Sequence, residues 1–551
     1  MVMWVTLVAY ICIMVGIGIY CKKKTGSVSD FVLGGRSLGP WMTAFAYGTS
    51  YFSAVVFIGY AGQFGWNYGI AATWIGIGNA VIGSMLAWML LGNRTRILTK
   101  QLDVSTMPEF FEKRYVSKGL KTAAACIVFV FLIPYTASVY NGLSRLFEQA
   151  FGFDYSICII VMALLTAVYV ILGGYMATAI NDFVQGVIML AGIAAVVVCV
   201  LNSQGGILQA MTGLGEITDT GVPQNSLNSL FGPDPLNLLG VVILTSLGTW
   251  GLPQMVHKFY AIKDKPAVKR GTIISTLFAV VVAGGSYFMG GFGRLFATPQ
   301  EITNPETGEL VYDMVVPALL NVAIPELLFG IVVVLVLSAS MSTLSSLVLT
   351  SSSTLTLDLI KGNVVKNMGE KQQLRYMRVL LVVFVIISAA LALVQYSSSI
   401  TFIAQLMGIS WGALAGAFLG PFLWGLYSGR VSRAAVWASF IVGVGLTTGN
   451  MVMGFFGTPL IASPINCGAL AMVISLVIVP VVSLFTKAVP FEVDSPHAEG
   501  AIDREYVQEL ERELARVKED ARQQGREGVA PGGEDVQDGE QEGEQTPLGA
   551  L

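Results

Sequence analysis

Three stretches of this chain carry hydroxyl side chains inside long apolar runs, and two of them also carry glycine. Residues 47–53 read YGTSYFS, and residues 245–254 read TSLGTWGLPQ. In the third stretch, residues 337–346, the residues that recur at helical spacing on one face are Ala339, Ser342, Thr343 and Ser346. Hydroxyl and carbonyl oxygens are the ligands that a hard cation such as sodium takes. The alternative for each stretch is close helix packing, or hydroxyls that bond their own helix.

The residue types on which most enzymes depend are scarce. The six cysteines form no CxxC pair, there are only two histidines, and no HExxH, P-loop or GxSxG pattern occurs. We therefore expect no catalytic residue, no cofactor and no enzyme activity.

Composition places the three stretches in a membrane. Of the 551 residues, 54% are hydrophobic and 12% are charged, which is about half the charged share of a soluble domain. A bilayer-spanning helix needs about 20 apolar residues. We expect an all-α polytopic membrane protein with thirteen spans, at about 2–21, 38–62, 70–92, 122–144, 155–172, 178–201, 236–256, 271–293, 323–357, 377–395, 401–427, 433–456 and 466–486.

Basic residues predict the orientation. If the N-terminus lies outside and the spans alternate, 24 of the 26 lysines and arginines in residues 1–494 fall in inner loops, Lys258 among them. The other two are Arg145 and Arg294. Cytoplasmic loops carry this excess of positive charge, so we expect the N-terminus outside and the C-terminus inside.

Composition changes near residue 490. We predict a transmembrane domain over 1–490 and an acidic cytoplasmic tail over 491–551. The tail contains a short polar helix at about 501–523, followed by a Gly- and Gln-rich segment that is typical of disorder.

Two of the polar stretches lie in the second and seventh spans, five spans apart. Unwound backbone inside a bilayer is tolerated only where it is packed in protein or lines a cavity, and matched broken helices in two halves are typical of inverted-repeat transporters. We therefore predict repeats at about 38–201 and 236–427.

Two further residues have two interpretations each. Asp182 is either an interfacial residue or a functional group inside the bundle, and Tyr135 either faces a polar cavity or packs against its neighbours.

In the polar stretches described above and in three short motifs, the chain resembles the sodium:solute symporter family, which includes the bacterial proline and pantothenate symporters. The resemblance rests on FVLGGRSLG at 31–39, LGG at 172–174 followed by NDFVQ at 181–185, and MSTL at 341–344, and it extends over about residues 1–487. It implies the LeuT-type five-plus-five inverted-repeat fold.

The resemblance also implies a site. The sodium ligands would be the carbonyls of Thr49, Phe52 and Ala339 and the hydroxyls of Ser342 and Thr343, with Asp182 on the ion route toward the cytoplasm. The substrate-binding residues that we expect are Ser50, Tyr51, Ser53, Tyr135, Thr249, Trp250 and Pro253. Tyr51, Thr245 and Thr249 stand where the proline symporter has an aspartate, a tryptophan and a tyrosine, which argues against proline as the solute. The stretches SYFSA at 50–54, FIG at 57–59 and GLP at 251–253, with Lys263-Asp264, look more like those of the pantothenate symporter.

We therefore expect a sodium-coupled symporter of the plasma (inner) membrane that imports a pantothenate-like carboxylate or an amino acid by alternating access. Its expected partners are sodium, the solute and the bilayer, without nucleic acid; the sequence does not predict an oligomeric state. Two alternatives with the same fold are a membrane-embedded solute sensor, against which the short tail argues, and a sodium-independent facilitator.

Overall fold

The computed structural model describes residues 2–22, 27–218, 222–303, 308–361, 363–365, 367–398 and 403–491. Within these ranges the regular structure is helical, with a few isolated bridge pairs and no strand. The tail that we predict over 491–551, with its helix at about 501–523, lies outside the described residues apart from residue 491.

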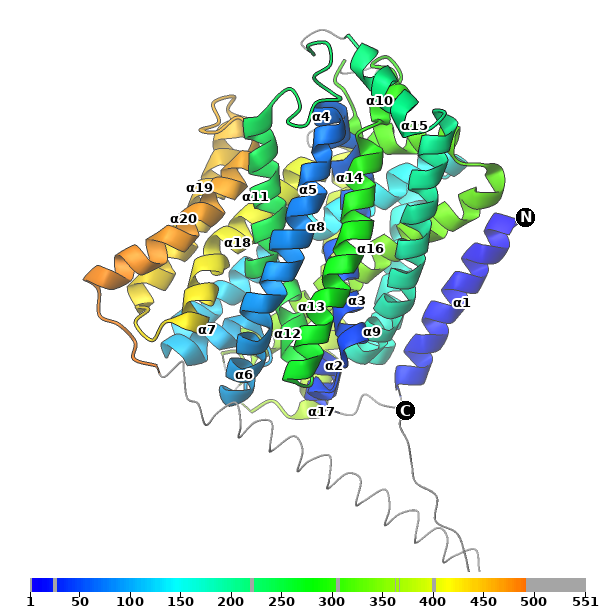
Figure 1. Ribbon diagram of the computed structural model, residues 1–551. Coiled ribbons are helices and arrows are strands. Elements are labelled where there is room, and N and C mark those ends of the chain that lie inside the picture. Colours follow the sequence, from blue (N-terminus) through cyan, green and yellow to red (C-terminus); the bar gives the residue numbers. More distant parts are fainter. Residues whose placement is uncertain are drawn as a thin grey trace, which may run out of the picture. The chain divides into compact units, whose positions relative to one another are not determined.

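The chain forms twenty α-helices within the described residues (Figure 1). The first ten are α1 (Val2–Lys22), α2 (Val28–Leu33), α3 (Pro40–Tyr51), α4 (Ala61–Tyr68), α5 (Thr73–Gly78), α6 (Asn93–Gln101), α7 (Met107–Tyr115), α8 (Lys118–Phe151), α9 (Tyr155–Ser203) and α10 (Ile207–Glu216). The others are α11 (Pro235–Gly251), α12 (Pro253–Ala261), α13 (Lys265–Ala279), α14 (Gly285–Gly290), α15 (Val315–Ala323), α16 (Glu326–Thr354), α17 (Glu370–Ser398), α18 (Ile403–Tyr427), α19 (Arg433–Phe455) and α20 (Pro464–Phe485).

Ten helical segments in the described part of the chain are long and apolar enough to cross a membrane, and the bent pair α11–α12 makes an eleventh. Two of them, Val55–Gln101 with 47 residues and Tyr155–Ser203 with 49, are about 70 Å long. A bilayer core is about 30 Å thick, so neither is a single straight crossing. They contain Gly69 (φ 59°) and Gly174 (φ 55°), respectively, each in a conformation that breaks a helix. Helices thus cover all thirteen predicted spans, while the number of crossings stays a prediction.

Burial separates central from peripheral helices. The apolar window of α16 is 94% buried and that of α18 is 89% buried, whereas the windows of α1, α19 and α20 are only 22–33% buried. A helix that is apolar and buried on all sides belongs to the middle of a bundle. The helix that carries Ser342 and Thr343 is therefore a central one.

The two helices α6 and α7, which carry five lysines and arginines between them, lie at the same end of the bundle. In Figure 1, α2, α6, α7 and α12 lie at the lower end, whereas α10 and α15 lie at the upper end. This arrangement agrees with the predicted polarity of charge. One residue departs from it, because Lys258 is 1% exposed inside the bundle on α12 rather than in a loop.

The stretch 31–39 joins distant parts of the bundle. A Cβ on Gly174 would lie 2.8 Å from the carbonyl oxygen of Phe31, so the two glycine-containing motifs meet where only glycine fits. Leu38 donates a backbone hydrogen bond to Ala261 (3.2 Å) and accepts one from Lys263 (3.1 Å). These bonds tie the start of α3 to the end of α12.

Candidate functional site: two broken spans against a hydroxyl-rich helix

Both predicted helix breaks are present. The helix α3 ends at Tyr51, Phe52 is extended (φ −102°, ψ 91°), and the chain continues as a π-helix over Val55–Tyr60. The helix α11 ends at Gly251, and α12 begins at Pro253 after a 46° bend. Pro253 occupies the first helical position, where its missing N–H costs no helix bond.

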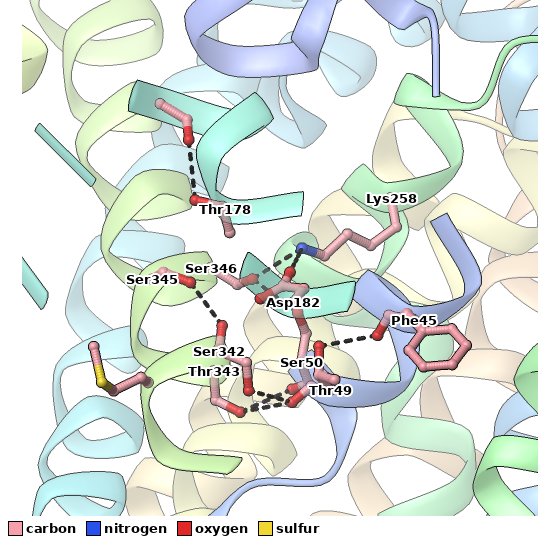
Figure 2. A network of polar contacts seen from close by, with 12 residues as sticks. Phe45, Thr49, Ser50, Thr178, Asp182, Lys258, Ser342, Thr343, Ser345 and Ser346 are labelled. Carbon is pink, nitrogen blue, oxygen red and sulfur yellow. Dashed lines mark hydrogen bonds and ion pairs between the residues drawn. The ribbon is translucent and has the colours of Figure 1, made fainter. Parts of the chain in front are cut away.

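The break in α3 faces the hydroxyls of α16, as Figure 2 shows. The carbonyl oxygen of Thr49 lies 3.0 Å from Oγ of Ser342 and 3.2 Å from Oγ1 of Thr343. The carbonyl oxygen of Ala339 lies 3.2 Å and 3.3 Å from the same two hydroxyls. The structure thus brings together four of the five residues that the sequence assigns to sodium.

Acceptor oxygens outnumber protons in this cluster. Ser342 and Thr343 have one hydroxyl proton each, yet they lie within 3.4 Å of the carbonyl oxygens of Thr49, Ser50, Ser338 and Ala339. The carbonyls of Ser338 and Ala339 lie inside α16, but those of Thr49 and Ser50 belong to the last turn of α3, where helix carbonyls have no intrahelical donor. A cation satisfies such a set of neutral oxygens, so the donor set fits sodium.

Phe52 remains outside this cluster in the described contacts. Among the described residues, no hydrogen bond joins its carbonyl to Ser342 or Thr343, whereas the ring of Phe52 stacks on Tyr51 with centroids 4.1 Å apart. Its assignment as a sodium ligand stays a prediction.

Asp182 lies inside the bundle rather than at an interface. It is completely buried on α9, two turns after Gly174, and its Oδ2 is 3.7 Å from Nζ of Lys258. Nζ of Lys258 also donates a 2.9 Å hydrogen bond to Ser346, whose Oγ lies 2.8 Å from Oγ of Ser50. Figure 2 shows this chain of contacts beside the oxygen cluster.

Aromatic residues surround the two breaks. The hydroxyl of Tyr51 donates a 2.6 Å hydrogen bond to the carbonyl of Thr245 and so joins α3 to α11. Trp411 on α18 lies 6.2 Å from Tyr51 and 5.8 Å from Tyr135, measured between ring centroids. The Tyr135 hydroxyl and the Trp411 indole N–H are both buried, and neither has a well-formed hydrogen bond among the described residues. The two groups lie beside each other next to the break in α3.

The other expected substrate residues have different surroundings. The hydroxyl of Thr249 donates to the carbonyls of Gly83 and Ser246, and the indole of Trp250 donates to Ile82. The Ser53 hydroxyl accepts a bond from the N–H of Val55. Ser50 points toward Ser346 instead of toward Tyr135. Their contribution to substrate binding stays a prediction.

Two residues of the site were missed in the sequence. Lys258 was counted as a loop charge, although its position only six residues after the break at Leu252 was a signal that it could lie within the bundle. Trp411 was not named, although it occupies the middle of a span, away from the membrane interfaces where tryptophan is common.

Comparisons with known proteins identify the family. The sodium:solute symporter family model matches residues 31–443. The osmoregulated proline transporter OpuE of Bacillus subtilis (strain 168) is 29% identical over 455 residues, covering 81% of this chain and 89% of that protein. A sodium/proline symporter of Staphylococcus aureus (strain JH9) is 30% identical over 452 residues, covering 80% of this chain and 84% of that protein.

The fold is also that of a solved transporter. The structure of a substrate-bound, outward-open Na⁺-coupled sialic acid symporter superposes with a TM-score of 0.68 at 16% identity, over 89% of this chain and 99% of that one. The molecule is therefore an all-α, multi-pass transporter with a LeuT-type fold. The chain belongs to the sodium:solute symporter family, whose members are symporters of the plasma membrane.

Proposed function

We propose that this protein uses the sodium gradient to import a small organic solute, either a pantothenate-like carboxylate or an amino acid, by alternating access. The observation that carries the proposal is the oxygen cluster between the break in α3 and the hydroxyls of α16. It gives a cation several neutral ligands from two different helices.

In this mechanism, sodium is a ligand that joins two elements. By bridging the Thr49 carbonyl to Ser342 and Thr343, it holds the unwound end of α3 against α16. Because Tyr51 follows two residues later and bonds the carbonyl of Thr245 on α11, ordering the end of α3 also orders the aromatic residues beside the second break. A solute then binds more tightly when sodium is present.

The solute class follows from the groups near the breaks. Tyr135 and Trp411 offer two buried donors beside aromatic rings, which suits a solute with a carboxylate or carbonyl and an apolar body. Two of the similar proteins transport proline by name. Proline, other amino acids, pantothenate and monocarboxylates are therefore the solutes to test.

The driving force suffices for accumulation. One charge moving through 100 mV supplies about 2.3 kcal/mol, and a tenfold sodium gradient adds about 1.4 kcal/mol. Together these support a solute gradient of several hundredfold per sodium ion.

The test is flux into proteoliposomes that contain the purified protein. We expect a labelled solute from this panel to accumulate against its own gradient only when sodium is directed inward. Equilibration without sodium would identify a facilitator instead, and binding without flux would identify a sensor.

A further inference from the structure

Lys258 places a positive charge in the interior of the bundle, next to the proposed ion site. It is 1% exposed, and the ring centroid of Tyr175 lies 5.2 Å from its Nζ. Burying an isolated ammonium is very costly. Asp182 at 3.7 Å and Ser346 at 2.9 Å are the groups that compensate for this cost.

Only two serine hydroxyls separate this ammonium from the oxygen cluster. Ser346 follows Ser342 and Thr343 by one turn of α16, and it bonds Ser50 at 2.8 Å. The carbonyl of Ser50 is in turn 3.4 Å from Oγ1 of Thr343. A sodium ion in the cluster and the ammonium of Lys258 would therefore influence each other strongly through a buried, poorly screened interior.

Asp182 is incompletely satisfied. Neither carboxylate oxygen accepts a well-formed hydrogen bond among the described residues, and the contact with Lys258, at 3.7 Å, is longer than a charge-assisted hydrogen bond. A fully buried carboxylate with one loosely held counterion can exchange that counterion for another cation.

We propose that Lys258 is a tethered cation that competes with sodium for Asp182. The proposal rests on sodium-coupled transport by this protein. Without sodium, the ammonium neutralises Asp182 and closes the route between the oxygen cluster and the end of the bundle that carries α2 and α6. Sodium that leaves the cluster toward Asp182 displaces the ammonium.

The position of Lys258 couples this exchange to movement. It belongs to α12, whose end is bonded to the start of α3 through Leu38, Ala261 and Lys263. Lys258 therefore moves with the inner halves of both broken spans, whereas Asp182 and Ser346 lie on α9 and α16. Withdrawal of the ammonium and displacement of the two inner half-helices are one event, which lets sodium pass only when the route opens.

The test compares the sodium dependence of uptake in proteoliposomes for the wild type, K258M, D182N and the double variant. K258M leaves a free negative charge near the cluster, so the half-saturating sodium concentration should fall about tenfold or more, while net uptake slows and solute exchange persists. D182N leaves a free positive charge, so that concentration should rise by a similar factor. In D182N/K258M, which has neither charge, it should return to within about threefold of the wild type.

The control is K263M, which removes a lysine that is 37% exposed near the end of the same helix and should leave the sodium dependence unchanged. If removing one partner of the buried pair prevents K258M from folding, the comparison of D182N with the double variant still tests the proposal. A half-saturating sodium concentration that is raised in D182N and returns toward the wild-type value in D182N/K258M supports competition between Lys258 and sodium. Sodium dependence that shifts in the same direction in both single variants, or that matches K263M, would overturn the inference. A wild type without sodium-driven uptake would instead refute the proposed function.

Discussion

At the scale of residues, the site depends on two hydroxyls that serve more acceptors than they have protons. Ser342 and Thr343 bond mainly to carbonyls of their own helix and to Thr49. Such back-bonding adds little to the stability of a helix. Their loss should therefore affect ion binding much more than folding.

We expect S342A/T343A to raise the sodium concentration for half-maximal uptake at least about tenfold, because two of the proposed neutral ligands are lost, while expression and insertion remain normal. Sodium titration of uptake measures this effect. S352A is the matched control, since Ser352 lies on the same helix and its hydroxyl, among the described residues, donates to the carbonyl of Leu349 in that helix. An unchanged sodium requirement in the double variant would show that the ion binds elsewhere.

Tyr135 provides a residue-scale test of the solute site. We expect Y135F to raise KM for the solute severalfold without changing the sodium requirement, because a buried donor to the solute is lost. Solute titration at saturating sodium measures this change. Y140F is the control, because Tyr140 lies on the same helix with an equally buried hydroxyl that has no hydrogen bond in the described residues. Equal effects of the two variants would count against a role of Tyr135 in binding.

At the scale of elements, close glycine contacts fix the positions of the helix breaks within the bundle. Gly174 turns α9 at the point where it meets Phe31, with a left-handed φ of 55°. Leu252 interrupts α11 and α12, and the close approach of Gly251 to Ala415, where a Cβ would lie 2.8 Å from its Cα, keeps this break packed against α18. Glycine is required at both contacts for steric reasons.

We expect G174A to destabilise the protein, because the new methyl group would clash with Phe31 and because alanine in the backbone conformation of Gly174 (φ 55°, ψ −148°), which is essentially restricted to glycine, costs about 1–3 kcal/mol. Thermal unfolding in detergent should show a lower midpoint than that of the wild type. In G449A, the control on α19, nothing lies within 4 Å of the new Cβ, so its midpoint should stay the same or rise slightly. Equal midpoints for G174A and the wild type would contradict the packing argument.

At the scale of the whole molecule, sodium and solute binding should be linked through the two broken spans. The Thr49 carbonyl contacts α16, and Tyr51, two residues later, contacts α11, so order at one site extends to the other. Linkage of this kind is reciprocal: each ligand should strengthen binding of the other by the same factor.

We expect a transported solute to raise the midpoint of thermal unfolding in sodium but hardly at all in choline at equal ionic strength. A ligand at a hundred times its Kd stabilises the folded state by about 2.7 kcal/mol, so the shift should be easily measured. The S342A/T343A variant should lose the sodium-dependent part of the shift. If the solute raised the unfolding midpoint by the same amount in choline, solute binding would not depend on sodium.

The amino-acid sequence by itself determined the class of the protein, the helical spans, both breaks and the polar face of α16. These features are local: apolar run length, glycine and proline content, and helical spacing act within a few turns of the chain. Tertiary structure decided which polar groups meet. It placed Lys258 beside Asp182, turned Ser50 toward Ser346 and set Trp411 against Tyr135. The partners in each contact lie on different helices, and the energy that selects them comes from pairing buried charges, closing hydrogen bonds and packing aromatic rings in the assembled bundle, which no single segment contains.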